Sequence, residues 1–91
     1  MSDSEAGYFV YMLLCADGTF YTGTSNDVKK RVQTHNKGKG AKYTKVRRPV
    51  KLLYQEKLTD KSAALKREAA IKKLSRYQKE KLLKSNGISW N

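Results

Sequence analysis

The chain of 91 residues is long enough for one domain with a modest core, which excludes a multidomain enzyme. It carries 20 Lys and Arg against 8 Asp and Glu, a net charge of +12, and only 38% of its residues are hydrophobic. Because it has no apolar run long enough to span a membrane and a single cysteine, Cys15, we expect a cytoplasmic protein with neither a membrane partner nor a disulfide framework.

The basic charge is confined to the later part of the sequence. Residues 1–27 contain four acids and no Lys or Arg, whereas residues 28–91 contain all 20 bases and the other four acids. A basic region of this density repels itself unless it meets a polyanion, and nucleic acid is the polyanion that we expect. A solvated basic surface with a weak, nonspecific role is the alternative.

The first part of the sequence predicts a β-hairpin. Residues 1–6 are small and polar, and we expect them to be disordered. The aromatic and apolar run from Gly7 to Cys15 is typical of a strand buried on both faces. Asp17-Gly18 is a hairpin turn signal, so residues 19–24 form the second strand. Gly23 in that strand indicates a bulge or a close approach of another group.

The remainder predicts helices around one further strand. A helix is expected from about Asp27 to Asn36, followed by a basic loop with a helical turn near residues 41–44. Residues 50–55 form the third strand. Two helices follow, from Asp60 to about Leu74 and from Ser75 to about Ser85, the second behind a capping box.

This order of elements, β-β-α-β-α-α, indicates an α+β fold in which helices pack on a small sheet. We assign residues 7–84 to the domain and residues 85–91 to a C-terminal tail.

Two pairs of residues have the chemistry of a functional site. Tyr11 and Tyr21 lie in adjacent strands of the predicted hairpin, so both phenols could point from one face; core packing with a wet hydroxyl is the alternative. Arg31 and His35 lie one helical turn apart, where Arg can grip a phosphate and His can move a proton near neutral pH. An ordinary solvated helix face is the alternative for this pair.

Glu68 is the only acid between Lys61 and Lys79, where it lies among seven bases. Helical spacing puts it beside the apolar Ala64 and Ile71. A carboxylate in such surroundings is costly unless it is paired or ligates a divalent metal ion. A salt bridge to a neighbouring Lys or Arg and a metal site are both open from the sequence.

The loop after the first helix is suited to nucleic acid. Its glycines allow backbone amides to approach a phosphate, and Tyr43 could stack on a base. A flexible solvated loop is the alternative. The candidate nucleic-acid-binding residues are Lys30, Lys37, Lys39, Lys42, Tyr43, Arg47 and Arg48.

Together the candidates include a general base, an Arg for phosphate, a His and a carboxylate for a divalent ion. These are the parts that a hydrolytic phosphodiesterase needs. The candidate catalytic residues are Tyr11, Tyr21, Arg31, His35 and Glu68.

Their order and spacing resemble the GIY-YIG nuclease superfamily, in particular its small single-domain bacterial (YhbQ-like) branch. The motifs that match, within residues 7–83, are Phe9-Val10-Tyr11, Tyr21-Thr22-Gly23, Asn26 to Asn36 with Arg31 and His35, the run from Gly38 to Thr44, a Glu in a later helix, and Lys73 to Lys79. The first motif reads Phe-Val-Tyr in place of Gly-Ile-Tyr. The resemblance implies a three-stranded antiparallel sheet flanked by helices.

The resemblance also implies cleavage of DNA phosphodiester bonds with one divalent metal ion, Mg²⁺ or Mn²⁺. By motif position Tyr11 and Tyr21 match the two motif tyrosines, Arg31 and His35 the helix arginine and histidine, and Glu68 the metal-binding glutamate. We therefore expect a DNA endonuclease, with DNA repair or recombination as its setting. In this interpretation Tyr11, with Tyr21 as the alternate, activates water, and nearby cations together with the metal ion lower its pKa. A catalytically silent nucleic-acid-binding module with the same basic face is the alternative.

Overall fold

The computed structural model describes residues 7–90, so the disorder expected for residues 1–6 lies outside the described residues. The sheet has three antiparallel strands in the order β2-β1-β3. The strands are β1 (Tyr8–Leu14), β2 (Phe20–Ser25) and β3 (Lys51–Leu58).

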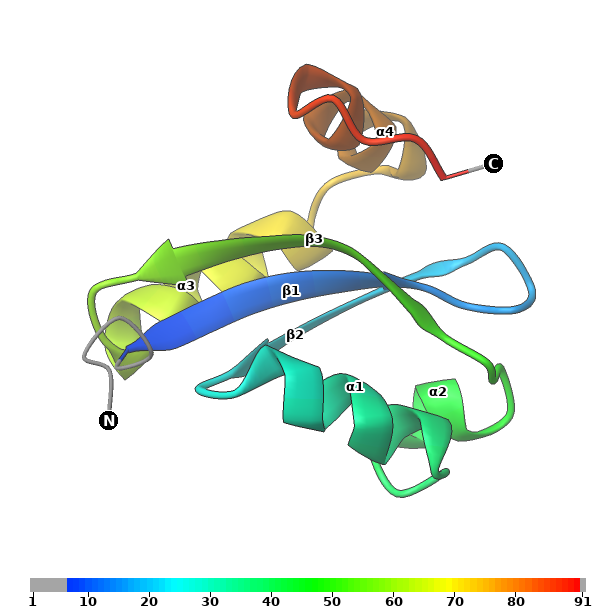
Figure 1. Ribbon diagram of the computed structural model, residues 1–91. Helices are drawn as coiled ribbons and strands as arrows, with labels where there is room; N and C mark the ends of the chain where they lie inside the picture. The colour runs from blue at the N-terminus through cyan, green and yellow to red at the C-terminus, as the bar shows by residue number, and fades with distance from the viewer. Residues whose placement is uncertain (1–6, 91) are drawn as a thin grey trace.

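The helices cover both faces of the sheet. They are α1 (Val28–Asn36), α2 (Lys42–Lys45), α3 (Lys61–Lys72) and α4 (Arg76–Ser85). In Figure 1, α1 and α2 lie below the strands and α4 lies above them, with α3 behind the sheet. The predicted α+β fold and its order of elements are confirmed, and α2 is the helical turn expected in the basic loop.

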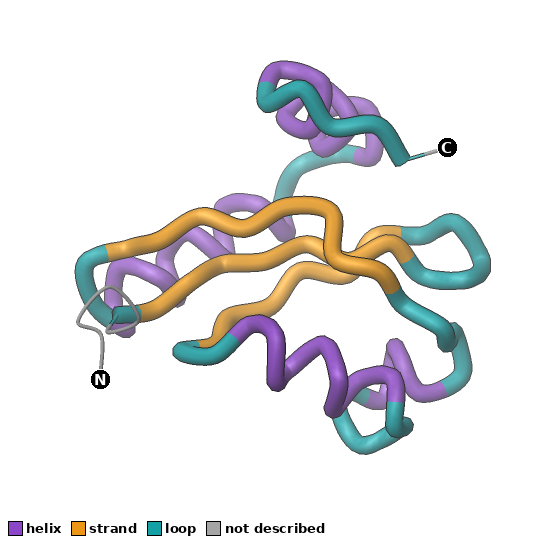
Figure 2. The backbone as a smooth tube through the Cα atoms, in the orientation of Figure 1, coloured by secondary structure: helices purple, strands orange, loops and turns teal. Residues whose placement is uncertain are grey.

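The central position of β1 explains its composition. β1 is the middle strand of the sheet, as Figure 2 shows, and helices cover both faces of the sheet. Val10 and Met12 pack with Ala64 and Ile71 of α3 on one face. Tyr11 packs with Val28 of α1 and other apolar residues on the opposite face. The strand is therefore buried on both faces, as predicted.

Local sequence signals fix most of the element ends. Gly18 has a φ of +85° in the turn between β1 and β2, a conformation that glycine adopts readily. Asp27 and Asp60 accept hydrogen bonds from backbone amides in the first turns of α1 and α3. Ser75 and Gln78 form the predicted capping box of α4.

Two predicted boundaries are wrong. The third strand runs from Lys51 to Leu58 rather than over residues 50–55, because its pairing with β1 continues to Tyr8 opposite Leu58. Its polar residue Glu56 stays in the strand by pairing with Arg67 of α3 at 2.7 Å. The α3 helix ends at Lys72 rather than near Leu74, because Ser75 already belongs to the cap of α4.

The described part of the C-terminal tail packs on the domain. Ile88 and Trp90 contact the core cluster between the sheet, α3 and α4. The Trp90 ring meets Phe20 of β2 edge to face, with ring centroids 5.9 Å apart. Among residues 7–90, no helix has the length and hydropathy that crossing a membrane requires.

Candidate active site

Gly23 allows Tyr11 to reach the edge of the sheet. The two residues are partners across β1 and β2, and β2 is an edge strand. A Cβ atom at Gly23 would lie 2.6 Å from the Tyr11 hydroxyl oxygen and 2.7 Å from its Cζ. The phenol end of Tyr11 therefore lies directly over Gly23. The close approach that Gly23 predicted is confirmed.

The Tyr11 hydroxyl makes a buried hydrogen bond with His35 of α1. The hydroxyl oxygen lies 2.8 Å from His35 Nε2, and both side chains are 1% exposed. On the other side of the imidazole, Nδ1 lies 2.7 Å from the hydroxyl of Thr44 in α2. His35 is thus part of a buried chain of polar groups, and the solvated helix face considered for it is excluded.

The hydrogen bonds of Thr44 indicate which nitrogen of His35 carries a proton. The Thr44 hydroxyl donates to the Ala41 carbonyl oxygen at 3.0 Å, so towards His35 its oxygen accepts from Nδ1–H. The competing Ala41 amide lies farther from Nδ1, at 3.5 Å. Nε2 is then unprotonated and accepts the hydrogen bond of the Tyr11 hydroxyl.

Gly40 closes the packing around His35. A Cβ atom at Gly40 would lie 2.8 Å from both Cγ and Cε1 of the imidazole, so only a glycine fits against the ring. The loop between α1 and α2 therefore presses its backbone on His35. Two glycines, Gly23 and Gly40, provide the space for the Tyr11–His35 pair.

Burial governs the protonation of both groups. Burial and the neighbouring Tyr21 raise the pKa of Tyr11 to about 12, although Arg31 acts to lower it. Burial, helped by the charge of Arg31, lowers the pKa of His35 from 6.5. Without a metal ion the neighbouring cations therefore do not bring the pKa of Tyr11 down, and the contribution expected from the ion stays a prediction. His35 is neutral at pH 7 and able to accept a proton.

Tyr21 joins the same cluster of rings. Its centroid lies 6.4 Å from that of Tyr11 and 5.1 Å from that of His35. It also stacks on Tyr43 of α2 at 6.1 Å. The prediction that both phenols share one face of the hairpin is confirmed, and α1 and α2 complete the cluster.

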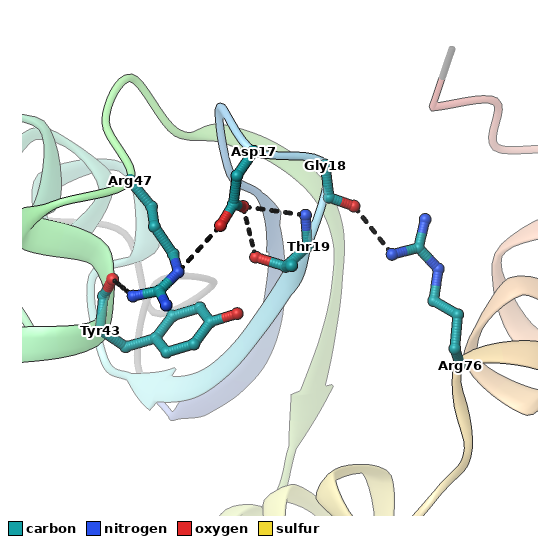
Figure 3. A network of polar contacts seen from close by, with 6 residues as sticks. All are labelled: Asp17, Gly18, Thr19, Tyr43, Arg47 and Arg76. Atoms are coloured by element: carbon teal, nitrogen blue, oxygen red, sulfur yellow. Dashed lines mark hydrogen bonds and ion pairs between the residues drawn. The ribbon is translucent and has the colours of Figure 1, made fainter.

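The tip of the β1–β2 hairpin is held by arginines from two distant segments (Figure 3). Arg47 pairs with Asp17 at 2.9 Å, and its guanidinium carbon lies 3.8 Å from the centroid of the Tyr43 ring. Arg76 of α4 donates to the Gly18 carbonyl oxygen at 2.8 Å. Arg47 and Tyr43, both expected to contact nucleic acid, are thus also engaged with the hairpin that carries the tyrosines.

Glu68 approaches β2 from α3. Its Oε1 is 3.5 Å from the hydroxyl of Thr24, the residue after Gly23. Its Oε2 is 2.8 Å from Nζ of Lys72, one turn farther along α3. The salt-bridge alternative for Glu68 is therefore realised. The carboxylate is 17% exposed, and it is close enough to Tyr11 to contribute to the raised pKa of the phenol.

The donor set around Glu68 suits a divalent cation that keeps most of its own water ligands. No group of three or more His, Cys, Asp or Glu side chains gathers anywhere in the part of the chain that the structure describes. Mg²⁺ commonly binds through one or two carboxylates together with water and substrate phosphate. The Glu68 carboxylate is one oxygen ligand of the kind that this mode of binding uses, and in the structure it pairs with Lys72.

Basic side chains surround the approach to Arg31. Lys30, Arg31 and Lys39 line a pocket of about 430 Å³ that also reaches Gly40. The residues Lys30, Lys37, Lys39 and Lys42 are exposed and have no carboxylate partner among residues 7–90. Arg48 instead donates to the backbone carbonyls of Lys45 and Asn36, at 2.8 and 3.3 Å.

Sequence reasoning did not single out Thr44 and Lys72, and it considered Gly40 only for an approach to phosphate. Thr44 and Gly40 fall in the run that resembles the small bacterial branch, but nothing in that run reveals contact with His35. Lys72 is one of the seven bases from Lys61 to Lys79, so its charge alone does not distinguish it. Its position four residues after Glu68 in a helix is the one available signal, since residues at that spacing face each other.

Comparison with known proteins identifies the class. The GIY-YIG catalytic domain model matches residues 7–81. The chain is 59% identical over 76 residues to a UPF0213 protein of Staphylococcus epidermidis, covering 84% of this chain and 93% of that protein. It is 57% identical over 77 residues to a UPF0213 protein of Staphylococcus aureus, covering 85% and 94%.

Two solution NMR structures are similar to this chain. The UPF0213 protein of Bacillus halodurans has 42% identity and a TM-score of 0.59, covering 88% of this chain and 85% of that one. A protein of E. faecalis has 45% identity and a TM-score of 0.60, covering 92% and 90%.

The chain therefore belongs to the GIY-YIG family, whose domain is that of an endonuclease superfamily. Its relatives are UPF0213 proteins, a small single-domain group within that class. The resemblance deduced from the motifs is confirmed.

Proposed function

We propose that this protein is a metal-dependent endonuclease that hydrolyses phosphodiester bonds in DNA. The observation that carries the proposal is the buried hydrogen bond between the Tyr11 hydroxyl and an unprotonated His35 Nε2, beside Arg31. An unprotonated imidazole nitrogen 2.8 Å from the hydroxyl can take up the phenol proton, which would let Tyr11 act as a general base. Membership of the GIY-YIG family supports the same reaction class.

In the proposed mechanism, Tyr11 is the general base and His35 receives its proton. As the Tyr11 hydroxyl gives its proton to Nε2, the phenol oxygen takes a proton from the attacking water. Thr44 holds Nδ1 protonated, which keeps Nε2 free as the acceptor. Arg31 neutralises charge on the phosphate and stabilises the phenolate. Tyr21, the alternate base, contacts the His35 ring only side on.

Glu68 is the residue that would hold the divalent ion, Mg²⁺ or Mn²⁺. Such an ion, when bound, neutralises phosphate charge and favours ionisation of nearby hydroxyl groups. An ion held by Glu68 would favour the phenolate form of Tyr11, and it would therefore oppose the burial that raises the pKa of Tyr11.

The basic residues around the site provide the proposed path for the DNA backbone. The pocket lined by Lys30, Arg31 and Lys39 also reaches Gly40, the residue that packs against the His35 ring. The remaining proposed contacts are Lys37, Lys42, Tyr43, Arg47 and Arg48. Action in DNA repair or recombination in the cytoplasm is part of the proposal.

A catalytically silent nucleic-acid-binding module is the second candidate. Two observations favour it: Lys72 occupies the Glu68 carboxylate, and the pKa of Tyr11 is about 12. Such a module would use the basic surface without turning over its ligand.

A cleavage assay distinguishes the two functions. Plasmid DNA and branched oligonucleotides are incubated with the protein and Mg²⁺ or Mn²⁺, in parallel with the Glu68→Gln variant. The nuclease cleaves only with metal present, and the variant binds DNA without cleaving it. Absence of cleavage on every substrate, with tight binding retained, identifies the silent module.

A further inference from the structure

We propose that Lys72 couples metal binding to DNA binding by occupying Glu68 until a phosphate draws it away. This inference rests on the proposed function to the extent that Glu68 holds the ion. It assigns to Lys72, a residue outside the sequence motifs, control over when that carboxylate becomes available.

In the ion pair of Glu68 and Lys72, Glu68 is the fixed partner and Lys72 is the movable one. The Glu68 side chain is 17% exposed, and one of its oxygens lies near Thr24 of β2. The Lys72 side chain is 53% exposed, and Nζ reaches the other oxygen at 2.8 Å. Lys72 can therefore swing into solvent on its flexible four-carbon stem while Glu68 stays in place.

The ammonium and a divalent ion compete for one carboxylate. Two cations within a few ångströms repel each other, most strongly beside a partly buried group. Metal binding at Glu68 therefore requires Lys72 to leave Oε2. In the protein alone this displacement lowers the affinity of Glu68 for the ion.

A bound phosphate supplies the alternative partner for Lys72. The hydrogen bond to Glu68 and, as a smaller contribution, the Tyr21 phenol raise the pKa of Lys72, so its ammonium lies within electrostatic range of that phenol. The phosphate attacked by the water activated at Tyr11 would lie on the side of the tyrosines. DNA thus draws Lys72 from Glu68 and exposes the carboxylate to the ion. Because coupling is reciprocal, the ion also strengthens DNA binding.

The coupling is measured from Mn²⁺ binding alone, without any cleavage. The full chain carrying Tyr11→Phe, which we expect to be inert, is titrated with Mn²⁺ with and without a short duplex oligonucleotide. Paramagnetic broadening of the amide NMR signals of Thr24 and Glu68 reports occupancy at this site. We expect DNA to raise the Mn²⁺ affinity about fivefold or more.

The Lys72→Met variant, made in the Tyr11→Phe chain, tests whether Lys72 is responsible for the coupling between Mn²⁺ and DNA binding. We expect it to bind Mn²⁺ more tightly than its parent without DNA, and to gain less when DNA is added. Lys72→Gln should behave in the same way, and Lys66→Met, an exposed change on the same helix, should match the parent.

If Lys72→Met and Lys72→Gln bind Mn²⁺ as the parent does, while Glu68→Gln abolishes the broadening, the coupling is refuted and the metal site stands. If the broadening survives Glu68→Gln, the metal site of the proposed function fails, and the coupling fails with it.

Discussion

The Tyr11 hydroxyl and Nε2 of His35 lie 2.8 Å apart and are shielded from solvent, although 24 positions separate the two residues in the chain. Strand β1 and helix α1 bring them together, and Gly23 and Gly40 leave room for the two rings. The proposed mechanism depends on this contact, because Nε2 of His35 is the acceptor for the Tyr11 proton.

We predict that Gly23→Ala abolishes DNA cleavage. The added methyl would lie 2.6 Å from the Tyr11 hydroxyl oxygen, so the phenol must move away from His35. Overpacking of this kind costs about 1–3 kcal/mol of unfolding free energy. The measurement is the cleavage rate with Mg²⁺, alongside unfolding by denaturant.

Gly87→Ala is the matched control. Gly87 has a φ of +72° and no neighbouring atom within 4 Å of an added Cβ. The substitution costs about 1–2 kcal/mol through backbone strain alone and leaves cleavage unchanged. Equal loss of cleavage in both variants would mean that stability, rather than the position of Tyr11, limits the activity.

The pH dependence of stability tests the state of His35. Its pKa lies below 6.5 in the folded protein, so near that pH the unfolded chain binds more protons than the folded chain. The stabilisation is full above pH 6.5 and is lost as the pH falls towards the folded pKa. His35 is the only histidine of the chain, and the lowered pKa values of Asp17 and Glu56 act below 4.5.

We therefore predict that the free energy of unfolding of the wild-type protein decreases between about pH 7.5 and 5.5. The His35→Gln variant is less stable but should show no such slope in this interval. Denaturant unfolding at a series of pH values measures both. A wild-type stability that rises on acidification would contradict a buried, neutral His35.

The parts of the fold that follow local chemistry could be predicted from the sequence. Asp17-Gly18 identified the hairpin, and the capping box beginning at Ser75 identified the start of α4. The end of β3 could not be predicted, because Glu56 and Lys57 lack the apolar pattern of a strand. Their place in the sheet depends on pairing with β1 and, for Glu56, on the ion pair with Arg67.

The sequence names the candidate site residues but does not predict how they are arranged. Motif spacing identified Tyr11 and His35, yet no local pattern indicates that they meet, because their contact depends on how α1 packs on the sheet. Thr44 was missed for the same reason, whereas Lys72 was missed although its spacing from Glu68 in α3 is a local signal. The pKa of Tyr11 was expected to be lowered by nearby cations and the metal ion, but without the ion burial outweighs the charge of Arg31.

Salt dependence tests the proposed DNA path. Lys39 is exposed, lines the pocket beside Arg31, and has no carboxylate partner in the described chain. We predict that Lys39→Ala weakens duplex binding and reduces the log–log slope against salt by about 0.9, the value for one phosphate contact. Lys66→Ala, on the helix behind the sheet, should leave the slope unchanged. Equal slopes for the two variants would contradict the assigned path.

Single-turnover cleavage by Tyr11→Phe tests the central claim most directly. This change keeps the ring over Gly23 and removes only the hydroxyl that bonds to His35. At DNA concentrations that saturate both proteins in Mg²⁺, we predict a rate at least about 10²-fold below wild type, with unchanged DNA affinity. The control Tyr77→Phe, at an exposed phenol, should cleave at the wild-type rate. Cleavage by Tyr11→Phe at the wild-type rate would contradict the role of Tyr11 as general base.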